Sequence, residues 1–162
     1  MRRAVESDVP AAAELAGRLA RMHHETDPDR FFLPDNVVEG YSWWFRRELA
    51  RKEAVLLVAE LHPPEASTTL AGYAYGSLGE RDWNLLLDAH GAIHDVYVAD
   101  ACRKLGVGAA LVAALVAELE ALGAPRILLS TMPSNTGAQR LFGRHGFRTT
   151  FFEMTRSRTR EA

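Results

Sequence analysis

The stretch RKLGVG at residues 103–108 decides how this chain folds, because it joins a strand to a long apolar helix. Residues 93–98 carry β-branched side chains and are predicted to form the strand. Beyond the stretch, leucines recur at spacings of three and four from Leu111 to Leu122, which is the spacing of one helix face. The two glycines therefore lie where the helix begins, among backbone N–H groups that have no intrahelical acceptor.

A helix that begins in this way favours an anion at its N-terminus. Its unpaired N–H groups and its macrodipole attract negative charge, above all phosphate, and glycine lets a ligand approach the backbone closely. Arg103 and Lys104 place positive charge where it opposes the dipole, and an anionic ligand would explain that arrangement. The alternative is a plain tight turn with solvated basic side chains. The stretch matches neither a Walker A motif nor the dinucleotide-binding fingerprint.

Composition narrows the class of protein. The 162 residues are 48% hydrophobic and 25% charged, which is typical of one folded globular domain. The net charge of -2 argues against a nucleic-acid partner, which would need a basic surplus. Cys102 is the only cysteine, so an internal disulfide and a zinc site with two thiolates are excluded, and no metal is predicted. No apolar run suits a signal peptide or a membrane span, so we expect a cytoplasmic protein without a membrane partner.

The rest of the chain alternates strands with helices and shows no repeat or linker, which indicates a single mixed α/β domain. The run from Val55 to Ala59 is continuously apolar and is expected to be buried on both faces of a sheet. Strands are predicted at residues 3–5, 55–59, 70–75, 93–98, 126–131 and 147–154. Helices are predicted from caps at Asp8 and Asp35 to about Met22 and Arg51, from Gly106 to about Leu122, and from Asn135 to His145, with a turn at His62–Ser67.

A second stretch, NTGAQRLFGRHGF at residues 135–147, agrees with the first. The two resemble the Arg/Gln-x-x-Gly-x-Gly/Ala and Asn-x-x-Ala-x-x-Leu/Phe-Tyr-x-x-x-Gly-Phe patterns of the GNAT superfamily of N-acetyltransferases. The resemblance extends from Met1 to Thr155. It implies a GNAT-like α/β (α+β mixed) fold, with a mainly antiparallel sheet flanked by helices and a splayed pair of central strands. We therefore expect an N-acetyltransferase domain at residues 1–155 and a polar tail at 156–162.

The resemblance also implies a co-substrate, acetyl-CoA, and the residues that bind it. The backbone of Val96 and Val98 would pair with the pantetheine arm, and Asn135 would face the cofactor from the far side of the cleft. The pyrophosphate would be held, mostly through backbone N–H groups, by Arg103, Lys104, Leu105, Gly106, Val107 and Gly108. Residues 93–98 are similar to the same strand in acetyltransferases of small-molecule amines.

Acetyl transfer to an amine needs a base, because an alkyl amine with a pKa of about 10.4 arrives protonated. His94 is the first candidate for this catalytic role, and side-chain alternation predicts that it shares a face with Val96 and Val98. Asp95, the second candidate, is expected on the opposite face unless the strand contains a bulge. The alternatives are a half-buried His94 without chemistry and an Asp95 that bonds nearby backbone donors.

The departing thiolate raises a second question. Many relatives place a tyrosine where this chain has Phe142, which has no proton to give. A thiol pKa of about 8.5 makes the thiolate a tolerable leaving group without help. A water molecule, Ser134 or Tyr97 could otherwise supply the proton. Cys102 is expected to be a packed thiol.

Acidic and aromatic residues in the first two helices and the loop between them would suit a cationic amine. They are Glu25, Asp27, Asp29, Phe31, Phe32, Trp43 and Trp44. The alternative is a solvated acidic loop over aromatic core residues. Tyr73 and Tyr75 are expected to share a strand face, and Trp83 could cover the thioester. The predicted activity is acetylation of a small-molecule primary amine. Acetylation of a peptide or protein N-terminus or lysine, a non-catalytic CoA-binding module, and a homodimer stay open.

Overall fold

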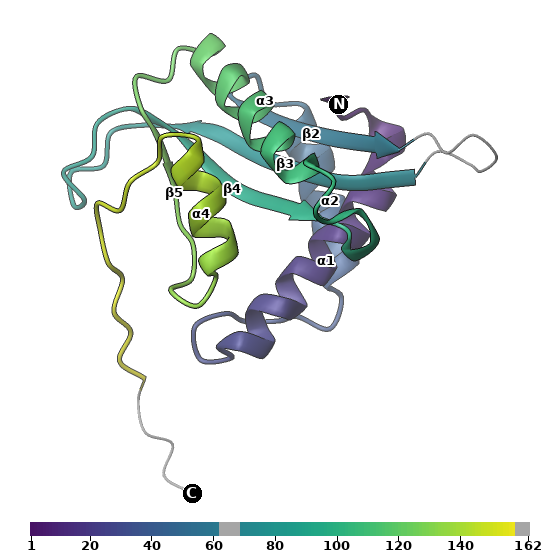
Figure 1. Cartoon of the computed structure of the whole chain (residues 1–162), viewed down its shortest axis with the longest axis horizontal. Helices are drawn as coiled ribbons and strands as arrows, with labels where there is room; N and C mark the ends of the chain where they lie inside the picture. Colours follow the sequence, from purple (N-terminus) through teal and green to yellow (C-terminus); the bar gives the residue numbers. More distant parts are fainter. Residues whose placement is uncertain (62–68, 158–162) are drawn as a thin grey trace, which may run out of the picture.

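A five-stranded sheet, with its strands in chain order, forms the middle layer of the protein (Figure 1). The structure is a computed structural model that describes residues 1–61 and 69–157. The first four strands run antiparallel and the fifth runs parallel to the fourth, so the sheet is mainly antiparallel. The strands are β1 (Arg2–Arg3), β2 (Ala54–Leu61), β3 (Thr69–Gly79), β4 (His90–Val98) and β5 (Ile127–Leu129).

Helices cover both faces of this sheet (Figure 1). The first two, α1 (Val9–Thr26) and α2 (Val37–Leu49), pack on one face, and α3 (Val107–Ala121) packs on the other, with α4 (Thr136–Arg144) beside it. Short 3-10 helices lie at Glu6–Asp8 and Asp100–Cys102.

Strand β2 shows how the apolar pattern builds two cores. Leu56 and Val58 pack toward α1 and α2, whereas Val55 and Leu57 pack toward α3. All four side chains are buried, which confirms the prediction of a strand buried on both faces. Among the described residues, no helix is long and apolar enough to cross a membrane.

The predicted helices and the first five predicted strands are all present, with shifts of a few residues at their ends. The strand predicted at residues 147–154 was wrong. The chain there is extended but pairs with no strand in the described part of the protein, and Figure 1 shows it leaving the body of the molecule after α4. Its apolar pattern favours extended backbone, but a strand also needs a neighbouring edge with which to form hydrogen bonds. The predicted turn at His62–Ser67, and residues 158–162 of the predicted tail, lie outside the described residues.

Strands β4 and β5 part early. Their pairing joins Gly91 to Ile127, Ala92 to Leu128 and Ile93 to Leu129, and no described residue of β5 pairs beyond that. Strand β4 continues for five more residues, to Val98. This divergence is the expected splay of the central strands, and it leaves one edge of β4 open.

The helix α3 anchors the sheet on one face. Leu111, Leu115 and Leu119 are fully buried in the core that it forms with β2, β3 and β4. We predict that Leu115→Ala lowers the free energy of unfolding by about 2–5 kcal/mol, because it removes packed methyl groups and leaves a cavity. Urea denaturation would measure the loss. Leu85→Ala, at a side chain that is 63% exposed, is the control and should change stability by less than about 0.5 kcal/mol. Equal losses in the two variants would contradict this account of the core.

Candidate active site

The N-terminus of α3 has the backbone geometry expected of the predicted anion site, which we call the anion cradle. Its first intrahelical hydrogen bond runs from the N–H of Ala110 to the carbonyl of Gly106, at 3.1 Å. The N–H groups of Val107, Gly108 and Ala109 therefore have no acceptor within the helix. Lys104 and Gly106 have φ angles of 65° and 81°, in the left-handed region, so the backbone bends sharply just before the helix. Successive N–H groups in such a bend converge on one point, as in phosphate-binding loops.

Gly108 lies where this cradle meets the neighbouring elements. A Cβ atom there would lie 3.5 Å from Leu141 of α4 and 3.6 Å from Val98 of β4, which are ordinary contacts. A side chain at this position would therefore fit the fold and project at the mouth between the two elements. The glycine is thus not needed for packing, whereas Gly106 is needed for its positive φ.

Arg103, one of the two basic residues of the cradle, contacts its own loop. Arg103 is turned back onto its own loop, where its guanidinium pairs with Asp100 at 2.6 Å and lies over the ring of Tyr97. Both charged groups are more than half exposed, so this pair contributes little to stability. If the loop binds phosphate, as the sequence predicts, Arg103 is already engaged by Asp100 and the backbone N–H groups are the remaining donors.

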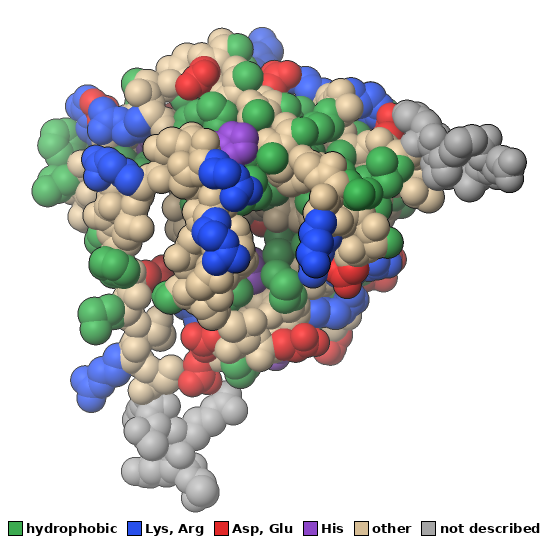
Figure 2. Space-filling model, in the orientation of Figure 1, with side chains coloured by type: hydrophobic (Ala, Val, Ile, Leu, Met, Phe, Trp, Pro, Cys, Tyr) green, Lys and Arg blue, Asp and Glu red, His purple; other side chains and the backbone are tan. Residues whose placement is uncertain are grey.

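The open edge of β4 continues from this cradle. Val96 and Val98 lie beyond the last residue that β5 pairs, and their side chains pack toward α3. Asn135 caps α4, because its carboxamide oxygen accepts a hydrogen bond from the N–H of Ala138 at 3.0 Å. Figure 2 shows an opening in the surface beside α4, with basic side chains around it.

A β-bulge in β4 overturns the predicted arrangement of the two candidate catalytic residues. Tyr75 of β3 pairs with Asp95, and the next residue of β3, Gly76, pairs with Ile93, so His94 is the extra residue. His94 contacts Tyr75 and Ser77, and Asp95 contacts Tyr73, so both point toward α1 and α2. The prediction that His94 shares a face with Val96 and Val98 was therefore wrong, whereas Asp95 lies on the face opposite these valines, as predicted.

Gly76 makes room for this bulge. A Cβ atom there would lie 2.8 Å from the carbonyl oxygen of Ala92 and 3.2–3.3 Å from the side chains of Leu115 and Leu119. The first distance is closer than real Cβ atoms approach a backbone oxygen. A glycine is therefore required opposite the bulge.

His94 is held on one side and accessible on the other. Its ring stacks on Tyr75 with centroids 5.2 Å apart, and its Nε2 lies 3.0 Å from the hydroxyl of Ser77. The packing removes water from the ring and lowers the pKa of His94 below 6.5; His90 and Arg51 act in the same direction, and Glu48 opposes them. His94 is therefore neutral at pH 7 and able to accept a proton.

Asp95 lies beside a buried tyrosine. It accepts a hydrogen bond from the hydroxyl of Tyr73 at 3.1 Å. Burial raises the pKa of Asp95 to about 6, although this hydrogen bond offsets part of the rise. Burial, reinforced by the charge of Asp95, also raises the pKa of the Tyr41 hydroxyl to about 12. The site therefore contains two groups, His94 and Asp95, that change charge below neutral pH.

Glu48 of α2 is a functional candidate that the sequence did not reveal. Its side chain is buried, accepts a hydrogen bond from the hydroxyl of Tyr75 at 2.6 Å and forms an ion pair with Arg51 at 2.8 Å. It thereby fixes the ring on which His94 stacks. An acidic residue on the apolar side of α2, four residues after Trp44, was the signal that could have identified it.

The residues predicted to bind the acceptor do not form one pocket. Trp44 packs edge-on against Tyr75, the ring on which His94 stacks, with centroids 4.6 Å apart. Trp43 is 64% exposed on α2, with Arg47 over its ring, and Phe31 stacks on His23. The other members, on the connection between the helices or at the end of α1, are exposed: Glu25, Asp27, Asp29 and Phe32.

The structure shows how several other residues singled out by the sequence are packed. Tyr73 and Tyr75 share a face and pack in the same core, and Cys102 is a buried thiol. Trp83 is 76% exposed in the β3–β4 connection, with Arg81 over its ring, and its covering of the thioester stays a prediction. Phe142 packs against Phe147. No group of three or more metal-ligating side chains occurs among the residues that the structure describes.

Comparison with known proteins shows the family to which this chain belongs. Residues 18–147 match the model of the acetyltransferase (GNAT) family, so the chain belongs to that family. No curated protein matches it significantly.

Solved structures with the same fold share few residues with this chain. A mutant of the BH1408 protein from Bacillus halodurans superposes with a TM-score of 0.79 and 18% identity, covering 98% of both chains. Glucosamine-6-phosphate N-acetyltransferase from Arabidopsis thaliana superposes with a TM-score of 0.70 and 18% identity, covering 96% of this chain and 95% of its own. Aminoglycoside N-acetyltransferase AAC(6')-Iy, in complex with CoA, superposes with a TM-score of 0.72 and 18% identity. The match covers 98% of this chain and 93% of that protein. At such identities the likeness shows the fold.

The anion cradle can be tested with a negative side chain. We predict that Gly108→Glu weakens binding of acetyl-CoA at least about tenfold, because a carboxylate at the helix N-terminus repels phosphate. Isothermal titration calorimetry would measure the affinity. Gly40→Glu is the matched control, since it adds the same charge on α2, where a Cβ atom meets nothing within 4 Å. Wild-type affinity in Gly108→Glu would show that the cradle is wrongly assigned.

Because its pKa is raised, Asp95 should make the free energy of unfolding depend on pH. Because the folded protein holds that proton more tightly than the unfolded chain, Asp95 stabilises the fold below pH 3.8 and loses this contribution as pH rises through about 6. Asp95→Asn should therefore gain stability over wild type between pH 4 and 7, by the order of 2–3 kcal/mol. Denaturant unfolding at several pH values would measure the difference. Asp88→Asn is the control: the ion pair with Arg81 lowers the pKa of exposed Asp88, so no such gain is expected.

Proposed function

We propose that this protein is an acetyl-CoA-dependent N-acetyltransferase that acetylates a primary amine of a small molecule by direct attack. The observation that carries the proposal is the placement of His94 and Asp95 next to an open strand edge that leads to an anion cradle. The edge suits an extended pantetheine arm, which would pair with backbone groups, and the cradle suits the diphosphate.

His94 is the proposed base. Ser77 and Tyr75 orient its ring, and Nδ1 is the nitrogen left to take a proton from the protonated amine, directly or through one water molecule. The freed amine nitrogen bonds to the acetyl carbon, the bond from that carbon to sulfur breaks, and the nitrogen gives its second proton to water as the amide forms. The sulfur leaves as thiolate and takes a proton from water or from a hydroxyl such as Ser134 or Tyr97.

Asp95 has a supporting role in this proposal. Its carboxylate faces the same side as His94, and its charge would attract the cationic amine while it is ionised, above a pKa of about 6. Two relatives of the same fold support a small amine as acceptor, because they are named as aminoglycoside and glucosamine-6-phosphate N-acetyltransferases.

A non-catalytic CoA-binding module is the second candidate. Phe142, at the position where many relatives have tyrosine, packs its ring 6.0 Å from that of Phe147 and supplies no proton. Acetyltransferases do not strictly require this proton, since a thiolate is a tolerable leaving group. Release of free thiol in the presence of amines distinguishes the two candidates.

A panel of amines, including aminoglycosides, amino sugars, polyamines and short peptides, should reveal at least one acceptor that releases free thiol from acetyl-CoA. With that acceptor, His94→Ala should lower kcat by about 10²–10⁴-fold and leave the affinity for acetyl-CoA nearly unchanged, because only proton transfer is lost. His90→Ala, at the start of the same strand, is the control. An unchanged kcat in His94→Ala would remove His94 from the mechanism. Binding of acetyl-CoA without thiol release from any amine would favour the non-catalytic module.

A further inference from the structure

Glu48 keeps a charged group in the interior of the protein. Its side chain is 2% exposed and lies on the side of α2 that faces the sheet. Burying a charge costs free energy even when the charge is paired, and apolar side chains in place of a buried ion pair are often neutral or stabilising. Packing of α2 against the sheet therefore does not by itself explain a carboxylate at this position.

The contacts of Glu48 lead to His94 through one tyrosine. Its Oε2 accepts a hydrogen bond from the hydroxyl of Tyr75 at 2.6 Å. The ring of Tyr75 stacks on that of His94, with centroids 5.2 Å apart and an angle of 26° between the planes. Burial and the hydrogen bond to Glu48 raise the pKa of Tyr75, so its hydroxyl stays protonated and remains the donor. Tyr75 thus contacts the carboxylate with its hydroxyl and the imidazole with its ring face.

A proton on His94 creates a positive charge that needs support. When Nδ1 takes a proton from the ammonium group, the ring is cationic until it gives that proton to water. Packing against Tyr75 removes water from the ring and disfavours the cation, which lowers the pKa of His94. The negative charge of Glu48 acts in the opposite direction.

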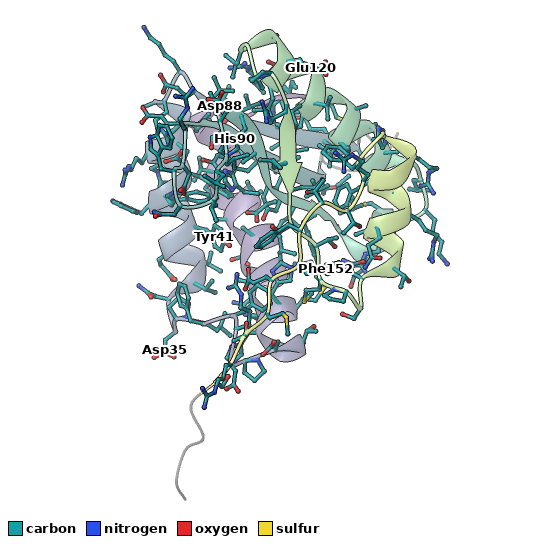
Figure 3. The ribbon with its side chains drawn as sticks, turned by 90° about the vertical axis from the view of Figure 1, so that its left-hand side faces the viewer. Asp35, Tyr41, Asp88, His90, Glu120 and Phe152 are labelled. Carbon is teal, nitrogen blue, oxygen red and sulfur yellow. The ribbon has the colours of Figure 1, made fainter. Side chains whose placement is uncertain are left out.

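The groups around His94 decide how well this cation is supported. They are Glu48 on α2, Arg51 just beyond its end, Tyr75 on β3, and His90 and Asp95 on β4. His90, labelled in Figure 3 at the start of β4, and Arg51 both act against the cation. Asp95 accepts the hydroxyl of Tyr73 instead. Glu48 is therefore the carboxylate that is connected to His94 through Tyr75.

We propose that Glu48 is a positioning residue that supplies the counter-charge for the protonated His94, with Tyr75 as the link between them. This inference rests on the proposed function, because it gives Glu48 a part in the proton transfer to His94. A buried carboxylate stabilises the protonated histidine of a Ser-His-Asp triad in the same way, although those two groups are in direct contact. Arg51, whose side chain is 41% exposed, pairs with Glu48 and limits the effect.

Two variants with opposite effects test the role of the charge. Glu48→Gln removes the negative charge and keeps an oxygen that accepts the Tyr75 hydroxyl, whereas Arg51→Gln removes the opposing positive charge. The pKa of His94, followed by nuclear magnetic resonance of its ring protons, should shift to lower pH in Glu48→Gln and to higher pH in Arg51→Gln. The resonance that disappears in His94→Ala is the one to follow. Glu39→Gln, at an exposed position on the same helix, is the matched control and should leave this pKa unchanged.

Turnover with the acceptor found in the amine panel gives the second measurement. Glu48→Gln should lower kcat by about tenfold, leave the KM for acetyl-CoA nearly unchanged and move the acidic limb of the pH profile to lower pH. Arg51→Gln should move that limb to higher pH. Circular dichroism should show the same fold in both variants. If the ion pair only anchored α2, both variants would lose activity alike without opposite shifts, and this result would overturn the proposal.

The two measurements separate this proposal from the proposed function. The resonance of His94 is measured without an acceptor, so it reports on Glu48 whether or not an amine is acetylated. Turnover that depends on His94, with its pKa unmoved in Glu48→Gln, would overturn the role of Glu48 and support the proposed function. Opposite pKa shifts without turnover of any amine would support the pairing of Glu48 with His94 and count against the proposed function.

Discussion

One extra residue in β4 governs the chemistry of this site. A regular strand would send His94 and Asp95 to opposite faces of the sheet, where they could not serve the same substrate. The bulge at His94 sends both toward α1 and α2 and leaves Val96 on the face of α3. A bulge disrupts the hydrogen-bond ladder locally, and Gly76 accommodates it by letting the carbonyl of Ala92 come close.

The same bulge explains why the sheet opens. Ile93 is the last residue of β4 that pairs with β5, and the bulged His94 follows it directly. A bulge bends its strand and increases the local twist, so β4 turns away from β5 at this point. The backbone edge that becomes free leads to Val98 and on to the N-terminus of α3. One local irregularity thus sets the direction of the titratable groups and frees a strand edge, and in the proposed mechanism this coupling would hold the base close to the thioester.

The sequence predicted the features whose causes are local. Gly106 permits the left-handed bend before α3, and the leucines of α3 mark a helix face without reference to other elements. The face of His94 was mispredicted because a bulge depends on how β3 and β4 align, and the alternation of one strand does not contain that register. Glu48 was missed because its partner Tyr75 is distant in the sequence. The strand predicted at 147–154 was wrong because strand propensity describes a single segment, whereas a hydrogen-bonded ladder needs two neighbouring segments.

The two walls of the cleft differ in stability, and this difference suits an enzyme that must admit a long ligand. One wall consists of β4 and α3, whose core side chains are fully buried, and it carries the cradle and the proposed base. The opposite wall consists of β5 and α4, where no residue is buried. Elements with few buried contacts open at lower free-energy cost, so we expect the opposite wall to open more readily than the wall of β4 and α3. The better-packed wall would then keep His94 in register with the predicted anion cradle while the opposite wall opens.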